Sequence, residues 1–482
     1  MVRLKFIPAS LLAVMLSACA VGPNYAPPSP AKLAVPESYS TPAPPGTVGD
    51  GQRWWTSFND PQLTAIIELA LKQNLDIDQA VARLRQAREA LVQSNAGLFP
   101  TVRGSTSYSR NINIRGRSFG NITDAGIINE NYALSTDASY QVDLFGGVRR
   151  GIEASRASQA SSAYSVAQVR NSTASEVARN YIIARAAQAN LAITRGSLAI
   201  QDDNLEIVGF RMQAGLVSSF DTEQTRSQRA QTATQVPLLE QSFQQAANRL
   251  GVLTGQAPGA LKAELAATQP IPRGPDSVPV GIPADIIRLR PDVLVAERNL
   301  AAATAQIGVA KAQLYPVLNL TASISTNAGM IDRLTDIITG RVFGSIAQTI
   351  FDAGRNRSIV RSRRAAAEGA FAAYKQSVLR ALEDVENALT ALQTATAREQ
   401  DFETALDAST NAAVLARSQY RAGLTDITRL NTSESALFTA QNGLSNVRAD
   451  RAQALVQLYL ALGGGWDSVN PPSISSLTAP AK

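Results

Sequence analysis

Few side chains in this sequence could carry out chemistry. It has no histidine and one cysteine, Cys19, among 482 residues. Imidazole bases, Cys–His nucleophile pairs and most zinc sites therefore have no residues to form them. Serine, lysine and carboxylate side chains remain, but we find no constellation of them that would make an active site. We expect no catalytic residue, no metal site and no cofactor, and we do not expect an enzyme.

Cys19 lies in a context that predicts a modification. Arg3 and Lys5 form a charged start, residues 6–16 are apolar but too few to span a bilayer as a stable helix, and small residues follow. This order is typical of a secretory signal peptide. Leu16-Ser17-Ala18-Cys19 resembles a bacterial lipobox, in which residues 1–18 are removed and Cys19 is acylated; the alternative is an ordinary signal peptide with an incidental cysteine. Ala20 then implies sorting to the outer membrane.

The charge and the composition limit which classes of protein remain possible. The formal charge is +6, and loss of Arg3 and Lys5 leaves 43 basic against 39 acidic residues, or +4. This charge is too small, and too little interleaved with aromatic residues, to predict a nucleic-acid partner. Residues 19–50 are rich in Pro, Ala, Ser and Thr, and we interpret them as an acylated tether. Beyond the signal there is no apolar run of 18 residues, so a membrane-crossing part would have to be a β-barrel.

The chain repeats itself internally. A shift of 216 positions aligns residues 76–100 with 292–316 without a gap, and both segments end in proline. A shift of 208 positions aligns Ala214-Gly215-Leu216 with Ala422-Gly423-Leu424. The features follow one another in the same order in both halves, which indicates a duplicated unit.

Each half is expected to contain a pair of strands. Residues 132–144 and 318–325 alternate apolar and polar side chains with period two, and residues 101–109 and 342–351 are their less regular partners. This alternation is typical of a membrane barrel strand, although a sandwich edge explains it nearly as well. Four strands are too few for a membrane barrel, which needs about eight, so a barrel would require several chains.

A very long helix is expected after each strand pair. From Phe371 to Tyr420 a 3-4 spacing forms a sustained heptad seam, with a second stripe at Leu382 and Leu389. A helix from Arg355 to Tyr420 would be about 100 Å long. Gly215 and Gly423 mark turns into return helices that end near Leu250 and Leu462, which predicts antiparallel hairpins. An exposed coiled coil is the alternative reading of the heptads alone.

These features together resemble the TolC-like outer membrane factors, in particular their lipoprotein efflux branch (OprM/NodT-like). Local motifs agree: residues 21–25 resemble the segment after the acylated cysteine, and Trp54-Trp55 with Asp60 and Pro61 resembles the start of the first helix. The segment 289–293, which includes Arg290, Pro291 and Asp292, resembles the family motif that opens the second repeat. Pro291 and Asp292 suit a first helical turn.

The resemblance implies a mainly helical protein with a β membrane barrel. Each chain would supply four strands and long antiparallel helical hairpins, and a homotrimer would form a twelve-stranded β-barrel on a twelve-helix α-barrel. Residues 50–75, 256–285 and 463–482 would form a belt. The partners implied are outer membrane lipid, a periplasmic membrane-fusion adaptor protein and an inner-membrane RND-type transporter. The implied location is the outer membrane of a Gram-negative bacterium, with a long periplasmic portion.

The resemblance also places a periplasmic gate at the Gly215 and Gly423 turns. Tyr420 matches the gate tyrosine and Asp221 the first-repeat aspartate. The usual place of a gate arginine is Thr425, and places that are acidic in relatives are Arg429 and Thr432. Asp426 and Arg429 could supply a substitute contact; alternatively these are exposed turn charges of small energetic value.

We divide the chain as follows: signal peptide 1–18, acylated tether 19–50, repeat 1 at 51–260, linker and equatorial belt 261–285, repeat 2 at 286–465 and tail 466–482. The expected function is a passive exit duct of a tripartite efflux system for small toxic compounds. The alternatives are the exit duct of a type I protein secretion system and a non-conducting lipid-anchored coiled-coil scaffold.

Overall fold

The computed structural model describes residues 20–42, 51–112, 128–285 and 289–466. The predicted signal peptide, Cys19 and nearly all of the predicted tail lie outside these residues. The chain divides into two compact units, which we describe separately. The sheet unit contains Met1–Pro27, Arg85–Ser161 and Glu297–Ala373, and the helical unit contains Pro28–Leu84, Ser162–Ala296 and Tyr374–Lys482.

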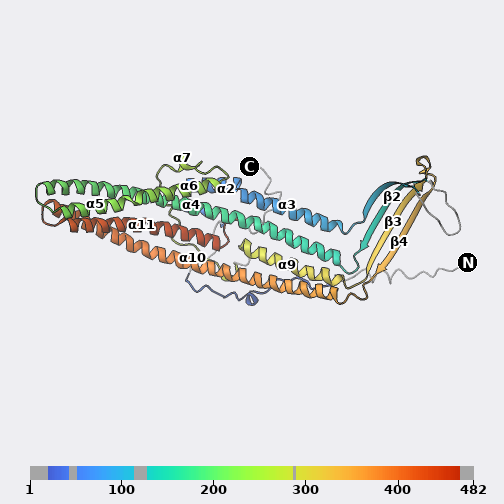
Figure 1. The fold of residues 1–482 in the computed structure, drawn as a ribbon. Helices are drawn as coiled ribbons and strands as arrows, with labels where there is room; N and C mark the ends of the chain where they lie inside the picture. The colour runs from blue at the N-terminus through green and yellow to red at the C-terminus, as the bar shows by residue number, and fades with distance from the viewer. Residues whose placement is uncertain (1–19, 43–50, 113–127, 286–288, 467–482) are drawn as a thin grey trace. The chain divides into compact units, whose positions relative to one another are not determined.

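The order of elements repeats, as the internal alignment predicted (Figure 1). The first half contains α2 (Pro61–Gln73), α3 (Leu75–Ala96), β1 (Thr101–Ile112), β2 (Ile128–Val142), α4 (Gly147–Gln213), α5 (Ser219–Ala233) and α6 (Gln235–Leu253). The second half contains α9 (Pro291–Ala312), β3 (Val317–Ala328), β4 (Ile338–Ala347), α10 (Arg355–Arg421) and α11 (Ile427–Ala461). The short elements are η1 (Pro30–Leu33), η2 (Gly51–Phe58), α7 (Lys262–Leu265), η3 (Pro283–Asp285) and η4 (Ile331–Arg333).

Equivalent helices of the two halves have equal lengths. α3 and α9 each have 22 residues, and α4 and α10 each have 67. α3 and α9 stop four residues before Pro100 and Pro316, so they are about six turns long. Among the described residues, no helix combines the length and the apolar character needed to cross a membrane.

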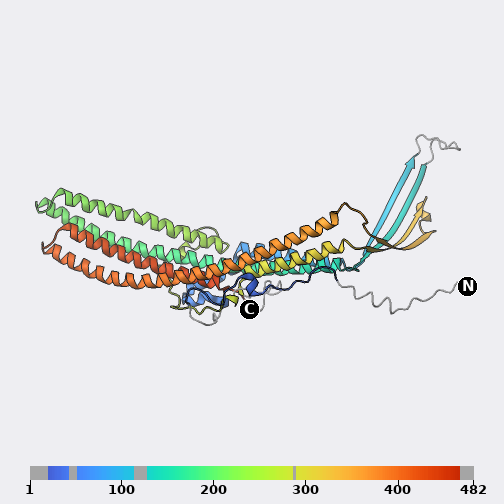
Figure 2. The same cartoon turned by 90° about the horizontal axis from the view of Figure 1, so that it is seen from below.

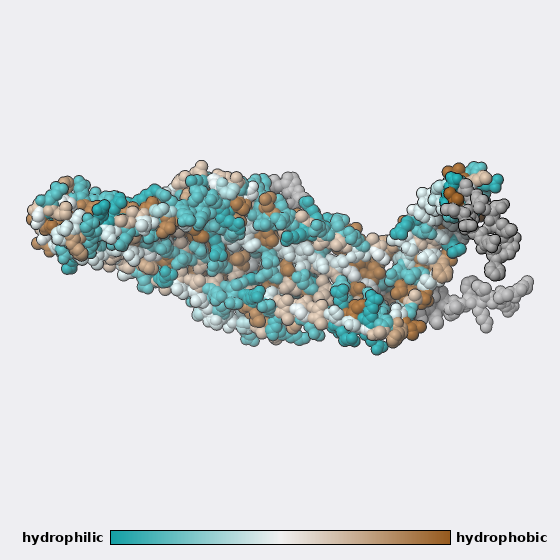
Figure 3. All heavy atoms as spheres, in the orientation of Figure 1, coloured by the Kyte–Doolittle hydropathy of each residue, from teal (hydrophilic) through white to brown (hydrophobic). Residues whose placement is uncertain are grey.

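The sheet unit carries one antiparallel sheet in the order β1-β2-β3-β4. The two repeats join where β2 pairs with β3, with Tyr140 opposite Leu320. Hydrophobic side chains are exposed on the face of the sheet visible in Figure 3, and Val342 and Ile346 of β4 are among the most exposed. β1 and β4 are the edge strands of this sheet.

The prediction of β4 was displaced along the chain. We expected residues 342–351, but β4 covers Ile338–Ala347, whose register is fixed by pairing with β3. Ile350 and Phe351 are apolar and look like strand residues, yet they lie exposed in the connection to α10. There the Asp352 carboxylate accepts the backbone N–H groups of Gly354 and Asn356 at 2.9 Å and begins the helix.

Long hairpins dominate the helical unit. Figures 1 and 2 show the α4–α5 and α10–α11 turns at the same end of this unit, with the four helices side by side. The predicted seam of α10 is buried from Tyr374 to Tyr420, and so are Leu382 and Leu389 of the second stripe, while Phe402 and Leu406 are partly buried. This burial confirms helices that pack on more than one neighbour. In the first half the return helix is interrupted at Thr234, shortly before Pro237, whereas α11 is continuous.

Two buried polar residues of α4 have a structural role. Gln188 is buried and donates to the Leu265 carbonyl at 2.7 Å. Arg185 is fully buried beside it and donates to the Leu265 and Ala267 carbonyls at 3.2 and 2.8 Å, and to the Gln62 side chain. These bonds tie two segments of the predicted belt, 50–75 and 256–285, to α4.

The described part of the tether is more ordered than its composition suggested. Residues Pro30–Leu33 form a short helix, and Leu33 is fully buried. The backbone N–H groups of Ser40 and Thr41 both donate to the Glu386 carboxylate of α10, at 2.6 and 3.1 Å. A Pro- and Ala-rich segment cannot form a core of its own. Here the bonds from its backbone N–H groups to the Glu386 carboxylate hold it in place.

Candidate functional site

The two hairpin turns have the same backbone geometry. Gly215 and Gly423 have φ angles of +71° and +74°, which favour glycine, and the next residue in each turn bonds back to the helix. The Leu216 N–H donates to the Arg211 carbonyl at 2.8 Å, and the Leu424 N–H donates to the Gln419 carbonyl at 2.9 Å. The duplicated Ala-Gly-Leu motif thus ends both long helices in the same Schellman-type turn.

The return helices begin with caps at equivalent positions. Ser218 caps α5, with its hydroxyl accepting the Asp221 N–H at 3.3 Å while the Asp221 carboxylate accepts the Ser218 N–H at 3.0 Å. Asp426 caps α11, with its carboxylate accepting the Arg429 N–H at 2.8 Å. Asp426 therefore contacts the backbone N–H of Arg429, which is a helix cap and not the substitute gate contact suggested by the sequence.

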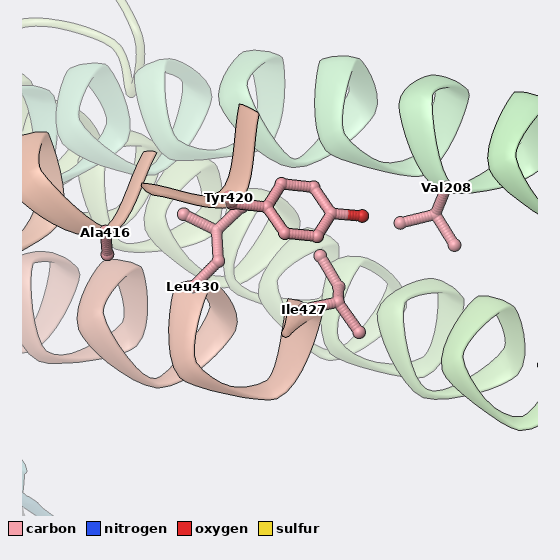
Figure 4. Packing of buried hydrophobic residues seen from close by; sticks show 5 residues of the cluster. All are labelled: Val208, Ala416, Tyr420, Ile427 and Leu430. Atoms are coloured by element: carbon pink, nitrogen blue, oxygen red, sulfur yellow. The ribbon is translucent and has the colours of Figure 1, made fainter. Parts of the chain in front are cut away.

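Tyr420 is the centre of the apolar cluster that joins the two hairpins (Figure 4). It is 2% exposed and packs with Val208 of α4, Ala416 of α10, and Ile427 and Leu430 of α11. In Figure 4 its ring lies beside Ile427, with the hydroxyl directed toward Val208. Burial raises the pKa of the Tyr420 phenol; the Arg211 guanidinium opposes this shift and Asp221 reinforces it. Within the described residues the hydroxyl has no hydrogen-bond partner.

A buried carboxylate lies further along α11. The Glu434 side chain is 7% exposed, accepts from Nε of Arg417 at 2.9 Å and accepts from Nδ2 of Asn204 at 2.6 Å. Burial raises the pKa of the Glu434 carboxyl, and the bonds from Arg417 and Asn204 oppose the shift without cancelling it. Because Asn204 belongs to α4, this bond also connects the two repeats. Sequence reasoning missed Glu434, Asn204 and Arg211, since no local pattern shows which residues of different repeats meet.

The family motif is a helix start, as the sequence predicted. Pro291 is the first residue of α9, and Arg290 before it is 8% exposed. Its guanidinium pairs with Asp292 and Asp384 at 2.8 and 2.9 Å and donates to the Ala461 carbonyl at 3.3 Å. Burial lowers the pKa of Arg290, but the two carboxylates outweigh burial and raise it. The motif thereby joins α9 to α10 and α11. Throughout the described part of the chain, no three acidic or cysteine side chains group as metal ligands.

The Outer membrane efflux protein family model matches residues 66–256 and 282–464, and this chain belongs to that family. It is an outer-membrane efflux channel and not an enzyme.

Individual relatives cover nearly the whole chain. Nodulation protein T of Rhizobium leguminosarum bv. trifolii is 31% identical over 95% of this chain and 96% of its own length. The pyoverdine export outer membrane protein OpmQ of Pseudomonas aeruginosa is 31% identical over 97% of this chain and 98% of its own. The solved structure of the outer-membrane channel OprN superposes with a TM-score of 0.85 at 30% identity, covering 93% of this chain and all of that one.

Proposed function

We propose that this channel is the lipid-anchored exit duct of a tripartite efflux pump, which exports small toxic compounds and works as a homotrimer with a periplasmic membrane-fusion adaptor and an inner-membrane RND-type transporter. The observation that carries the proposal is the pair of 67-residue helices that turn at one end of the helical unit. Relatives described as efflux or export proteins include the toluene efflux protein TtgF, the solvent efflux protein SrpC and the pyoverdine export protein OpmQ. The compounds in these names differ, so the proposal names a class of cargo.

Trimerisation is supported by the edges of the sheet. A chain with four strands leaves β1 and β4 as edges, and an exposed edge in a membrane would leave backbone groups without hydrogen bonds. Three copies supply twelve strands, which is enough to close, whereas one chain supplies only half of the smallest membrane barrel of about eight. The same three copies bring twelve helical segments, counting α5 and α6 as one, to the wall below.

Acylation of Cys19 is supported by the position of the residues that follow it. A Cβ on Gly146, in the loop between β2 and α4, would lie 2.5 Å from Cβ of Ala20, and the Val21 N–H donates to the Phe145 carbonyl at 3.1 Å. The start of the mature chain thus lies at the end of β2, where a strand leaves the sheet. An acyl chain on Cys19 would enter the lipid beside the barrel. We expect Cys19→Ala to lose palmitate labelling. The proposed barrel and trimer should both remain intact in this variant.

The gate is proposed at the turns, with Tyr420 as its centre and Asp221, Asp426 and Arg429 around it. Burial of Tyr420 between residues of both repeats supports this choice, because its removal would separate the hairpins. The capping roles of Asp221 and Asp426 show that both carboxylates are held in place by backbone groups. Gating is then a change in the packing of the two hairpins.

Planar-bilayer recordings of the purified, acylated protein test the proposal. We expect channels with a low open probability, which Tyr420→Leu and Asp221→Ala should raise, while Met212→Leu at the equivalent place in repeat 1 should not. Absence of conductance under every opening condition would overturn the exit duct. Crosslinking that stops at the monomer would overturn the trimer and favour the scaffold.

A further inference from the structure

The closing contact at Tyr420 includes a cation that the sequence comparison did not identify. Arg211 lies in the last turn of α4, in repeat 1, and Tyr420 lies in the last turn of α10, in repeat 2. The Arg211 guanidinium carbon is 4.2 Å from the centroid of the Tyr420 ring, and Nη2 donates to the Tyr420 carbonyl at 2.9 Å. One side chain therefore binds both the ring and the backbone of the proposed gate residue.

This double contact suits arginine in particular. A planar guanidinium can stack on an aromatic face while its edge donates a hydrogen bond, and a lysine ammonium cannot do both in the same way. The carbonyl of Tyr420 belongs to the last turn of α10, where it also accepts the Gly423 N–H at 3.1 Å and where a positive charge is favourable. Arg211 also lies at the end of α4, so it neutralises two negative helix ends at once.

We propose that Arg211 is the positioning residue that holds Tyr420 in the closed gate, a role for which the family resemblance implied an arginine at the position of Thr425. The inference rests on the proposed gate and identifies how it is held: by the ring face and carbonyl of Tyr420 rather than by its hydroxyl. The hydroxyl, which points toward Val208 in Figure 4, makes no hydrogen bond within the described residues. Release of this contact would free the α10 turn from α4 and let the hairpins separate.

The first test is leak conductance of the full-length trimer in planar bilayers. Arg211→Ala should raise the open probability about tenfold, since a partly buried cation–π contact and a charge-assisted hydrogen bond are lost together. The open probability of Arg211→Lys should lie between those of wild type and Arg211→Ala. Arg421→Ala is the matched control, because Arg421 is an exposed cation in the same turn as Tyr420. Equal leakage of Arg421→Ala and Arg211→Ala would show that turn charge matters rather than the contact, and would overturn the inference.

Variants of Tyr420 test the role of Arg211 separately from the role of Tyr420 in the proposed gate. Tyr420→Phe keeps the ring and the carbonyl and should remain closed, whereas Tyr420→Leu should leak. Leakage of Tyr420→Phe equal to that of Tyr420→Leu would place the contact at the hydroxyl and overturn the inference. If Tyr420→Leu leaks and Arg211→Ala does not, only the role of Arg211 fails. If neither leaks, the gate assignment fails.

A double-mutant comparison excludes a general structural effect. The combined variant Arg211→Ala, Tyr420→Leu should leak less than the product of the separate effects, because the two residues share the ring contact, while the bond from Arg211 to the carbonyl of residue 420 remains in Tyr420→Leu. Leakage equal to the product of the separate effects would mean that they act independently. All variants should keep the crosslinked trimer of the wild type, so that altered conductance reports on the gate.

Discussion

Ser218 and Asp426 occupy the same place in the two hairpin turns, 208 residues apart, and both cap a return helix. The third residue of each return helix differs in charge: it is Asp221 in repeat 1 and Arg429 in repeat 2. Asp221 completes a capping box, whereas Arg429 contributes only its backbone N–H. An acidic residue suits the positive end of a helix and a basic one does not. The second repeat therefore has a basic side chain at a position where the helix end favours an acidic one. Capping of α11 does not explain the presence of Arg429 there.

Burial shows a second difference between the turns. Tyr420 is 2% exposed, whereas the equivalent Met212 is 39% exposed. The apolar cluster thus centres on repeat 2, and repeat 1 contributes Val208 with the partly buried Ile207 and Val217. The two turns share one backbone geometry, but their side chains differ. The turn of repeat 2 therefore supplies the buried centre of the contact between them.

The largest expected effect tests this asymmetry in burial. Tyr420→Ala should lower the free energy of unfolding by about 3–5 kcal/mol, because it empties a buried aromatic site. Met212→Ala should lower it by less than about 1 kcal/mol. Thermal unfolding of both proteins, followed by circular dichroism, measures the difference. Equal losses would mean that both turns carry the packing.

Removal of the helix caps should have the next largest effect on stability. Asp426→Ala should destabilise by about 1–2 kcal/mol and Ser218→Ala by about 0.5–1 kcal/mol, because Asp221 still accepts a backbone N–H after the serine is lost. Amide hydrogen exchange in the first turns of α11 and α5 reports each loss locally. Thr432→Ala is the control, since its exposed hydroxyl bonds only to the Thr428 carbonyl. A larger loss for Ser218→Ala would reverse the ranking.

Exchange of the third-residue charges should have smaller effects. Arg429→Asp builds a capping box in α11 and should stabilise it by about 0.5 kcal/mol, whereas Asp221→Arg should destabilise α5 by a similar amount. Unfolding midpoints of the two variants give the comparison. Destabilisation by Arg429→Asp would show that the Arg429 guanidinium makes a contact in the assembled duct, and would strengthen its assignment to the gate.

The smallest effect concerns pH. Glu434 is buried, while the equivalent residue of repeat 1, Arg226, has a side chain that is 70% exposed. Since the pKa of Glu434 is raised in the fold, its contribution to stability is complete below the unfolded pKa and is lost as pH rises through the folded value. The unfolding midpoint should therefore fall slightly in wild type as the pH rises above about 4.3, the ordinary pKa of a glutamate. Glu434→Gln should lose this part of the pH dependence, whereas Arg226→Gln should keep it; an unchanged profile in Glu434→Gln would assign the dependence elsewhere.

The sequence predicted those parts of the fold that repeat or that have a period. The two 67-residue helices, their glycine turns and the start of α9 at Pro291 follow from heptads, a duplicated motif and proline chemistry. The boundaries of β4 could not be predicted, because Ile350 and Phe351 are as apolar as strand residues and only pairing with β3 excludes them.

The site was predicted less completely. Tyr420 and both turns were found because they lie within local motifs. Arg211 and Glu434 were not, because their importance depends on partners about 200 residues away, and a charged residue in a helix looks the same whether it is buried or exposed. Burial of Arg185 was missed for the same reason.

The edges of the sheet have a consequence for biogenesis. A newly exported chain carries two unpaired strand edges, β1 and β4, together with exposed apolar side chains such as Val342 and Ile346. Such a species pairs readily with any free strand, so the time that a single chain spends outside the proposed trimer is a period of aggregation risk. Assembly of the proposed trimer would then compete with misassociation, and its yield should depend on how fast chains meet one another rather than on the stability of one chain.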